Sequence, residues 1–446
     1  MKWRNLGIAV LIFAALGAYV YFYEIKGGKK REEAEEKAKK LFQIEDKDIA
    51  SLTIKSENGE IVLQKDKDVW NVVSPVKAKA DKYAAEGLAS DFASARIERT
   101  LDDPNPNWKS YGLDPTVTKI SAKLANGKTQ ELDLGQKDFT EYSVFARVPG
   151  QNKVVVVPVS LLNNATKKLL DFRDKSVLEF QRDQAKEIAI DVKGKEFDFE
   201  KNGDNWTVKK PFQGRGDRSE IDSILSDLES AKVEEFLQPP SDQDLKTYGL
   251  NAPDVRVNVF LGENRAKKTL LIGKKVDTFY YAKDESKPEV FKIKEDLFKK
   301  LDVDAKKVRD KKILRIERAN LNRVDVKLPD KEFVFSKGAD DKWKVEKPEA
   351  QKGKAILDYK VFWPIEDLEG KDIIDHANLQ DPQYAFSKPT AEIQLTDKNK
   401  RVIQVTLGKL DKDLVFAKTG SEPTVYKVDK KILDDLNFKM DEIVEK

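Results

Sequence analysis

The feature that most constrains this 446-residue chain is a pattern that recurs three times, about 136 residues apart. Its clearest phrase is W-x-V-x-x-P, which begins at Trp70, Trp206 and Trp343. Three more phrases follow in a constant order: a Y-G-L type phrase with a Pro after it, an aliphatic residue before Gly, and an aromatic-Ala-basic triplet. The Y-G-L type phrase begins at Tyr111, Tyr248 and Tyr384. The aliphatic-Gly phrase begins at Leu134, Ile272 and Leu407, and the aromatic-Ala-basic triplet at Phe145, Tyr281 and Phe416. Four phrases in one order indicate a tandem array of similar units.

The repeats set the expected domain organisation. A chain of this length predicts about three domains on a prior of roughly 150 residues each. We expect a transmembrane anchor at 1–28, a stalk at 29–43, and repeats 1, 2 and 3 at 44–180, 181–317 and 318–446. Repeat 3 is divergent, because its second phrase is degraded to Tyr384-Ala385-Phe386. Each repeat is long enough to bury a core of its own.

The order of elements within a repeat predicts its fold class. Apolar residues alternate with polar ones before each repeated Trp, which is typical of antiparallel strands, and the Pro five residues later ends the Trp strand. A helix is then expected from Asp217, whose spacing to Glu220 fits a capping box. Four further strands and a closing helix near Asp296, running toward Val308, complete the repeat. This order predicts an α+β fold with a mainly antiparallel sheet and two helices in each repeat.

An uncharged apolar run extends from Leu6 to Tyr23. As a helix it spans roughly 27 Å, close to the hydrocarbon thickness of a bilayer. Aromatic residues crowd its far end, where such rings favour the headgroup layer. We therefore predict a single-pass signal anchor in the membrane. The alternative is a cleaved signal peptide, because Ala15-Leu16-Gly17 is an acceptable small-residue cleavage site.

The charges beside this run bear on its orientation. Basic residues at 26, 29, 30 and 31 outnumber those that precede the run, which taken alone favours a cytoplasmic position for the bulk of the chain. Long domains, however, are translocated largely regardless of such charges, and a short basic start before an apolar core is typical of export signals. We expect the protein in the inner membrane with its bulk extracytoplasmic, in the periplasm. The polar residues 29–40, with Glu-to-Lys pairs four apart, predict a helical stalk.

Composition excludes several classes of function. The chain has no Cys, so it has no disulfide, thiol catalysis or thiolate metal site. Its 82 basic and 79 acidic residues nearly cancel, and they alternate along the exposed positions. Nucleic-acid binding, which favours a strongly basic domain or stripe, is therefore not expected.

No motif indicates catalysis, a cofactor or a metal. The repeated Gly residues stand singly, without the spacing of a phosphate-binding loop, and Y-G-L before a Pro is typical of a turn. The one histidine, His376, cannot build a His-rich metal site, and we expect it to be an ordinary loop or helix-end residue. The repeated Trp residues have two interpretations: sugar-stacking platforms, or bulky core residues that hold the sheet against its helix, which we prefer.

Two features distinguish the connections between repeats and the last repeat. Arg173-Asp174-Lys175 and Arg309-Asp310-Lys311 end the closing helices and are interpreted as inter-repeat joints, with basic residues favourable at a helix C-terminus. Repeat 3 instead carries Phe362-Trp363-Pro364 within its predicted helix, which Pro should break. We expect Phe362 and Trp363 to contribute to a partner-binding patch, the alternative being displaced core residues.

Together the repeated phrases resemble those of a bacterial family of uncharacterised, membrane-anchored repeat proteins. The resemblance covers nearly all of residues 44–446. Members of that family are often encoded beside ATP-binding-cassette exporters of the gliding-motility type, which implies an accessory role in the envelope and no known chemistry. No functional residue is implied by the resemblance.

Three hypotheses of function follow. The first is a non-enzymatic, membrane-anchored docking or accessory subunit whose partners are membrane transporter subunits. The second is a cell-wall or glycan-binding module, which predicts exposed Trp rings. The third is an envelope hydrolase that uses carboxylates, which predicts converging Asp or Glu side chains with shifted pKa values.

Overall fold

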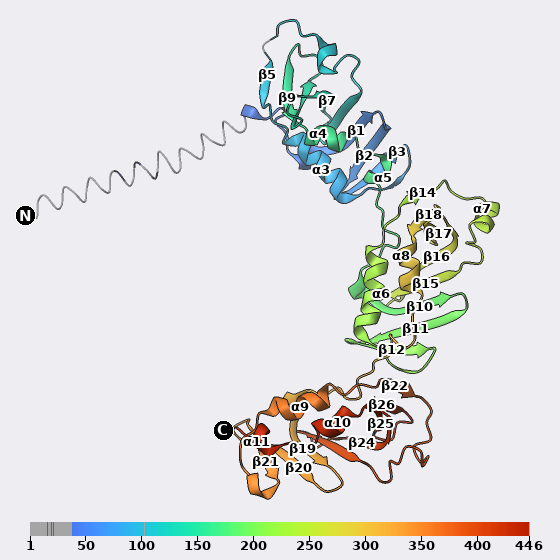
Figure 1. Cartoon of the computed structure of the whole chain (residues 1–446). Coiled ribbons are helices and arrows are strands. Elements are labelled where there is room, and N and C mark those ends of the chain that lie inside the picture. Colours follow the sequence, from blue (N-terminus) through green and yellow to red (C-terminus); the bar gives the residue numbers. More distant parts are fainter. Residues whose placement is uncertain (1–15, 17–18, 20, 22–37, 102, 446) are drawn as a thin grey trace, which may run out of the picture. The chain divides into compact units, whose positions relative to one another are not determined.

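The computed structural model describes residues 16, 19, 21, 38–101 and 103–445. They form three antiparallel sheets of nine, nine and eight strands, one sheet for each repeat (Figure 1). The chain divides into two compact units. The first holds 1–181, 227–256 and 268–299, and the second holds 182–226, 257–267 and 300–446. Repeat 2 therefore contributes to both units.

Repeat 1 consists of two antiparallel meanders joined side by side, with strand order β4-β3-β2-β1-β6-β7-β8-β9-β5. Its strands are β1 (Ile49–Ser56), β2 (Gly59–Asp66), β3 (Val69–Ser74), β4 (Ala78–Lys79), β5 (Arg99–Leu101), β6 (Thr118–Leu124), β7 (Thr129–Lys137), β8 (Ser143–Arg147) and β9 (Val154–Pro158). Its helices are α3 (Lys82–Ala93), α4 (Ser160–Ala165) and α5 (Leu169–Phe172), with short 3-10 turns η2 (Asp46–Asp48) and η3 (Trp108–Tyr111).

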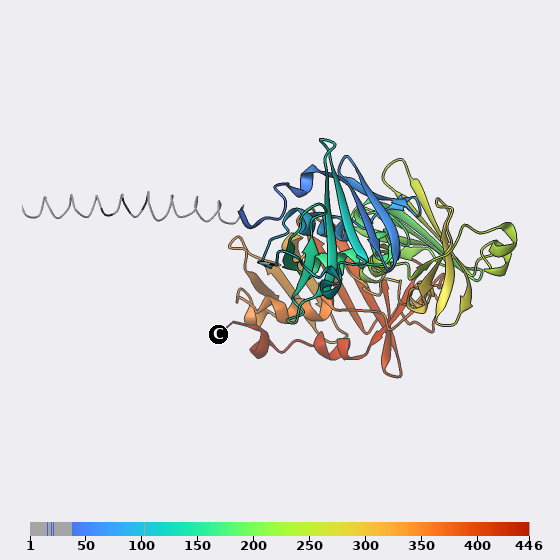
Figure 2. The same ribbon diagram turned by 90° about the horizontal axis from the view of Figure 1, so that it is seen from above.

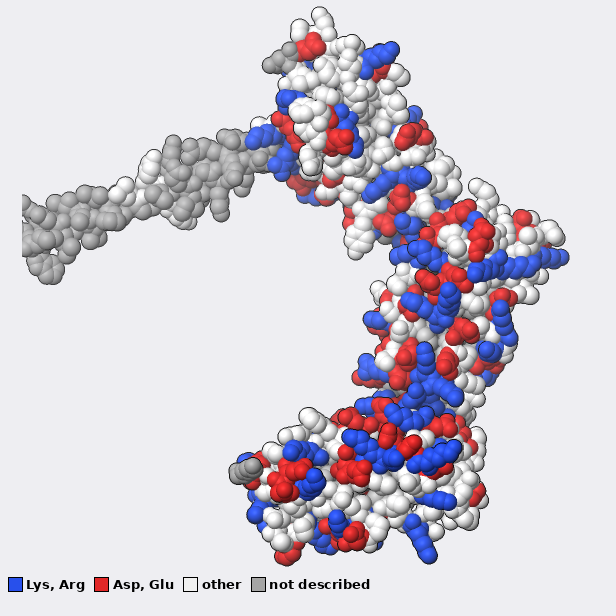
Figure 3. Space-filling model, in the orientation of Figure 1, with Lys and Arg blue, Asp and Glu red and all other residues white. Residues whose placement is uncertain are grey.

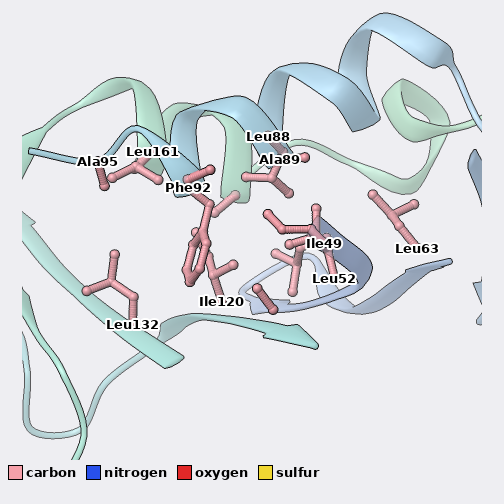
Figure 4. Packing of buried hydrophobic residues seen from close by; sticks show 14 of the residues in the cluster. Ile49, Leu52, Leu63, Leu88, Ala89, Phe92, Ala95, Ile120, Leu132 and Leu161 are labelled. Carbon is pink, nitrogen blue, oxygen red and sulfur yellow. The ribbon is translucent and has the colours of Figure 1, made fainter. Parts of the chain in front are cut away.

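The core of repeat 1 lies between its sheet and helices α3 and α4 (Figure 4). Asp81 caps α3 by accepting a hydrogen bond from the Ala84 amide at 2.8 Å. One face of α3 then buries Leu88 and Phe92 against the sheet. Phe42 stacks on Phe92 with ring centroids 4.9 Å apart, so the core of repeat 1 includes Phe42.

Repeat 2 has the same strand order, β13-β12-β11-β10-β15-β16-β17-β18-β14. Its strands are β10 (Ala185–Val192), β11 (Lys195–Asn202), β12 (Asn205–Lys210), β13 (Gly214–Arg215), β14 (Glu235–Phe236), β15 (Val255–Leu261), β16 (Ala266–Val276), β17 (Phe279–Asp284) and β18 (Phe291–Lys294). Its helices are α6 (Arg218–Ser230), α7 (Asp242–Thr247) and α8 (Glu295–Leu301), after the 3-10 turn η4 (Arg182–Gln184). Helix α7 stands out from the neighbouring strands in both ribbon views (Figures 1 and 2).

Repeat 3 keeps the plan with one strand fewer, in the order β21-β20-β19-β23-β24-β25-β26-β22. Its strands are β19 (Leu321–Lys327), β20 (Glu332–Lys337), β21 (Trp343–Lys347), β22 (Asp372–Ile374), β23 (Ala391–Asp397), β24 (Val402–Asp411), β25 (Leu414–Thr419) and β26 (Val425–Asp429). Its helices are α9 (Asp358–Glu366), α10 (Lys431–Asp435) and α11 (Met440–Ile443), with 3-10 turns η5 (Arg318–Asn320) and η6 (Glu349–Gln351).

The predicted α+β class with a mainly antiparallel sheet is confirmed, but the helices differ from the prediction in two respects. Among the described residues, each repeat has three helices in place of two: a long helix, which is α3, α6 or α9, and two shorter ones. Pro364 lies inside α9 without breaking it. Proline removes one helical hydrogen bond, and α9 ends two residues later, where the Asp367 amide still donates to the Trp363 carbonyl at 2.9 Å. The helix is short, so little of it remains to be disrupted.

The Y-G-L type phrase and the Gly phrase of each repeat pack directly against each other. A Cβ added to Gly135, Gly273 or Gly408 would lie 2.1, 2.2 or 1.9 Å from the carbonyl oxygen of the Tyr that opens the other phrase. In repeats 2 and 3 the amide after this Gly donates to the same carbonyl at 2.8 Å. Each Gly also lies where the pairing with the next strand shifts register. Only Gly permits this close approach, which explains why the two phrases recur together.

The joints are built from backbone bridges on both sides of each R-D-K triplet. In the first unit the backbone of Arg173 forms an isolated antiparallel bridge with Ala80, and Ser176 forms one with Lys232. In the second unit Arg309 bridges Gly216, and Lys312 bridges Glu369. Each triplet therefore connects the start of the long helix in its own repeat with the segment after the long helix of the next repeat.

The expectation that both triplets end a helix was wrong for the second one. Arg173 directly follows α5, but α8 ends at Leu301 and Arg309 lies in an extended segment eight residues later. The backbone bridges, rather than a helix dipole, hold the triplets in place. In repeat 3 the same bridge is formed by Val444 with Ile356, so Val occupies the position of the joint Arg.

The arginine side chains of the joints are held by an aromatic ring and a carboxylate. The Arg173 guanidinium lies 3.5 Å from the Phe236 ring centroid and pairs with Glu289 at 3.4 Å. Arg309 lies 4.5 Å from the Phe212 centroid and donates two hydrogen bonds to Asp375. These bonds outweigh the effect of burial and hold the pKa of Asp375 below its ordinary value.

The predicted membrane span lies almost entirely outside the described residues, which include only Leu16, Tyr19 and Tyr21 of it. In the part of the chain that the structure describes, no helix is both long enough and apolar enough to cross a bilayer.

The close approach of the two phrases predicts opposite effects for two Gly to Ala substitutions in repeat 1. Gly135→Ala should lower the free energy of unfolding by about 2 kcal/mol, because its Cβ would overlap the Tyr111 carbonyl. Gly87→Ala, in α3 with no heavy atom within 4 Å, should raise it by about 1 kcal/mol through helix propensity. Thermal unfolding of both variants measures the difference, and equal midpoints would contradict the packing argument.

Repeat 3 carries Ala385 where the other repeats have Gly, and Ala385 keeps a left-handed backbone with φ of 54°. We expect Ala385→Gly to stabilise the protein by about 0.5–1 kcal/mol, because it removes the steric cost of that conformation. The matched control is Ala377→Gly, at a nearby position without a positive φ, which should destabilise. Urea unfolding compares the two, and destabilisation by both changes would argue against strain at Ala385.

The Arg309–Asp375 pair predicts a stability difference that depends on pH. Asp375→Asn should cost about 1–2 kcal/mol at pH 7, given side chains 15% and 31% exposed for Arg309 and Asp375. Because the folded pKa of Asp375 is depressed, this contribution is complete above the ordinary pKa of about 3.9 and is lost as pH falls through the folded value.

Urea unfolding at pH 7 and pH 3 therefore tests the joint, and the gap between wild type and Asp375→Asn should narrow at pH 3. Asp413→Asn is the control, since Asp413 also pairs with a cation, Lys430, but its side chain is 83% exposed. That variant should differ little from wild type at either pH. An unchanged gap for Asp375→Asn at pH 3 would show that its effect is not electrostatic.

Candidate functional site

His376 is exposed in the loop after β22, with φ of 52°, as expected for an ordinary loop residue. Within the described ranges, no group of three or more His, Asp or Glu side chains is arranged to hold a metal ion. Asp217, the predicted start of a helix, accepts a hydrogen bond from the Glu220 amide at 3.1 Å at the start of α6.

The three repeated Trp residues are core residues. Trp70, Trp206 and Trp343 are all buried, which confirms the structural interpretation. Trp206 donates its indole N–H to Asp222 on α6 at 2.9 Å. Their rings therefore offer no exposed face for stacking a sugar.

Phe362 and Trp363, the two predicted partner-binding residues, lie on different faces of α9. Phe362 is fully buried and meets the Trp343 ring with centroids 4.9 Å apart, so its expected place on the surface was wrong. Adjacent residues of a helix point about 100° apart, so only one of the two can face the core. Trp363 faces outward, with 58% of its surface exposed.

The long helices of the three repeats can be aligned by one backbone hydrogen bond. Directly before each helix, one amide donates to a carbonyl of the segment that closes the same repeat, and the donors are Asp81, Asp217 and Leu357. Six positions later lie Gly87, Ser223 and Trp363. The common fold therefore tolerates small residues at this position. The large exposed ring belongs to repeat 3 alone and is not explained by packing.

Trp363 borders a groove of about 670 Å³ between α9 and the helices α10 and α11. On the α9 side, Tyr359 packs against Trp363 with centroids 4.8 Å apart, and Pro364 follows. On the opposite side the lining includes Ile432 and Phe438, both largely buried. We call these apolar and aromatic side chains the floor of the groove; they suit insertion of an apolar side chain from a partner, and most of the other lining residues are polar or charged.

The rim of the groove is charged, with an excess of acid. It holds six carboxylates against four lysines, whereas the whole chain has a net charge of +3. Three of the lysines are held within the rim: Lys360 donates to the Glu442 carbonyl at 2.8 Å. Lys431 donates to Asp435 and Lys439 to the Glu442 carboxylate, each at 3.0 Å, and these two bonds join charged partners. These two hydrogen bonds raise the pKa of Lys431 and Lys439. Elsewhere, the face seen in Figure 3 shows the two signs interspersed.

Sequence analysis identified only one wall of this groove. Ile432 and Phe438 lie about 70 residues after Trp363, in the closing segment of repeat 3, and sequence analysis did not single them out. The available signal was the substitution of a large aromatic residue at a position that is Gly or Ser in the other repeats. No pattern in the sequence places the closing helices beside α9.

Two solved structures align with most of the chain at low sequence identity. The DNA polymerase sliding clamp from Pseudomonas aeruginosa with ligand is 9% identical, and the alignment covers 89% of this chain and 95% of that one. The DNA polymerase III subunit beta from Pseudomonas aeruginosa is 10% identical, with the same coverage. Both have a TM-score of 0.13, too low to carry an argument. Among curated proteins, none matches this chain.

One family of sequences matches the chain twice, over residues 70–253 and 206–382. The two matches together cover 313 of the 446 residues. Each contains one R-D-K triplet and extends into the following repeat, so the family unit includes a joint. The chain therefore belongs to the family described as Domain of unknown function (DUF4340).

Proposed function

We propose that this protein is a non-enzymatic, membrane-anchored docking subunit of an envelope transport complex, and that the Trp363 groove is its partner-binding site. The observation that carries the proposal is the exposed indole of Trp363 above an apolar floor. The repeat fold does not require a large residue at that position. Exposed aromatic side chains beside a concave apolar surface are frequent anchors of protein interfaces.

The chemistry of the groove specifies a partner. An apolar side chain fits its floor, and basic residues flanking that side chain would meet the excess of carboxylates on its rim. We infer a basic, partly apolar segment of a membrane transporter subunit. The resemblance to proteins encoded beside ATP-binding-cassette exporters supports this class of partner.

The proposed location rests on the sequence. The apolar run 6–23 would hold the chain in the inner membrane, with residues 38–446 on the extracytoplasmic side. The groove would then lie in the repeat that is furthest from the anchor along the sequence.

The two other hypotheses receive less support. The glycan hypothesis predicted exposed rings at the repeated Trp residues, which are buried. A carboxylate hydrolase uses a general acid whose pKa is raised. Throughout the described residues, wherever a carboxylate pKa departs from its ordinary value it is lowered, as for Asp375 by Arg309 and Glu295 by Lys275.

The docking proposal predicts that Trp363→Ser, which introduces the residue of repeat 2 at this position, reduces recovery of the partner at least about tenfold. That loss corresponds to about 1.4 kcal/mol or more, within the range of an interface anchor. A photo-crosslinking amino acid at position 363 of the full-length protein, in native membranes, should yield an adduct with a transporter subunit. Mass spectrometry of the adduct identifies it.

Two matched variants separate binding from folding. A crosslinker at Tyr83, an 84% exposed position on α3, should give no such adduct. Phe362→Ala should cost about 3–5 kcal/mol in stability, because it empties the core beside Trp343, whereas Trp363→Ser should leave the unfolding midpoint nearly unchanged. The proposal fails if the adducts from positions 363 and 83 are the same, or if Trp363→Ser retains its partner.

A further inference from the structure

Repeat 1 carries a second exposed aromatic feature, in the loop between β7 and β8. Phe139 and Tyr142 are 88% and 81% exposed, among the most exposed large apolar side chains of the described chain. Neither was singled out by sequence analysis. We call residues 138–142 the aromatic loop.

The aromatic loop is held in a defined conformation by its own polar groups. The Asp138 carboxylate is buried and accepts hydrogen bonds from the Thr140 amide at 3.0 Å and from the Thr140 hydroxyl at 2.6 Å. The Asp138 amide donates to the Ser143 carbonyl at 2.9 Å, and the Val159 amide donates to the Tyr142 carbonyl at 3.0 Å. The two rings are therefore presented by an ordered turn, which lowers the entropy cost of binding.

The loop is an insertion that the other repeats lack. Six residues separate the paired residues Lys137 and Val144, but four separate Lys275 from Tyr280 in repeat 2. The corresponding turns of repeats 2 and 3 are Asp277-Thr278 and Lys412-Asp413, all exposed and polar. The fold therefore closes this hairpin without aromatic residues, and packing does not account for the loop of repeat 1.

The aromatic loop lies close to the point where the chain enters repeat 1. The Ser143 hydroxyl, directly after the loop, donates to the Glu98 carboxylate at 2.5 Å. The neighbouring Ile97 amide donates to the Lys39 carbonyl at 2.8 Å. The Glu98 amide donates to the Val156 carbonyl of β9 at 2.9 Å, so Glu98 lies two strand spacings from β8. Lys39, about one spacing further, is therefore within roughly 15 Å of Ser143. Residues 24–38, between the apolar run and this point, would reach about 22 Å as a helix.

The geometry points to a second membrane contact: we propose that Phe139 and Tyr142 insert into the headgroup layer of the bilayer that holds the anchor. This inference rests on the proposed membrane anchoring of residues 6–23. A short loop with two rings is too small for a stable protein interface, which buries about 800 Å² on each partner. It suits a lipid interface, where Phe and Tyr rings are favoured. Because the anchor keeps the loop near the bilayer, a weak contact is sufficient.

The chain has no Cys, so one introduced thiol can be labelled without a competing site. The test uses full-length protein in vesicles of phosphatidylcholine and phosphatidylglycerol, with an environment-sensitive fluorophore on Glu141→Cys, an exposed position that leaves both rings intact. Lipids carrying a nitroxide at headgroup depth should quench this label at least about twofold. The matched label on Thr278→Cys, in the shorter turn of repeat 2, should not be quenched.

To test whether the two rings cause the quenching, the Glu141→Cys measurement is repeated with Phe139→Ser and Tyr142→Ser added, which should abolish the quenching.

A label on Ile12→Cys reports the insertion of the anchor independently, through nitroxides placed deep in the bilayer. If the Ile12 label is quenched but the Glu141 label stays in water, the aromatic-loop inference is wrong and the anchor stands. If the Ile12 label is not quenched, the anchoring itself fails. A Glu141 label that is shielded from water but unaffected by nitroxide lipids would indicate a protein contact and would also overturn the inference.

Discussion

The backbone bridge that closes each repeat is the interaction on which the other features of the structure depend. In every copy, a residue after the last helix pairs with the residue just before the N-cap of the long helix: Arg173 with Ala80, Arg309 with Gly216, and Val444 with Ile356. This pairing fixes the start of the helix against the sheet. In the first two copies it also leads the chain directly into a second bridge with the next repeat. An antiparallel bridge satisfies backbone groups that would otherwise need water, so it tolerates changes of side chain.

A second constraint, the contact between a Gly and a Tyr carbonyl, closes the other half of each sheet. This contact accounts for two of the four recurring phrases, the Y-G-L type phrase and the Gly phrase. Features that neither constraint requires are free to vary, and both proposed contact surfaces lie at such positions. Trp363 replaces Gly or Ser on a helix, and the aromatic loop lengthens a hairpin that otherwise closes in two residues.

The core of repeat 3 shows how one surface could change without loss of the fold. Asp222 on α6 accepts the indole N–H of Trp206, but the same position on α9 is Phe362, which meets Trp343 through its ring. An aromatic contact thus replaces a hydrogen bond at the same place. The next residue along the helix, Trp363, is then presented to solvent beside the groove.

The sequence by itself determined the number of repeats, the antiparallel α+β class, the buried role of the repeated Trp residues and the absence of cysteine chemistry. These properties follow from the local alternation of apolar and polar residues and from phrases that recur at fixed spacing. Only the tertiary structure decided that Phe362 is core while Trp363 is exposed, because the helix start, and hence the face of each residue, depends on the bridge to Val444. It also decided that α10 and α11 form the second wall of the groove and that the aromatic loop lies near Lys39. Both are contacts between residues far apart in the chain, which local patterns do not encode.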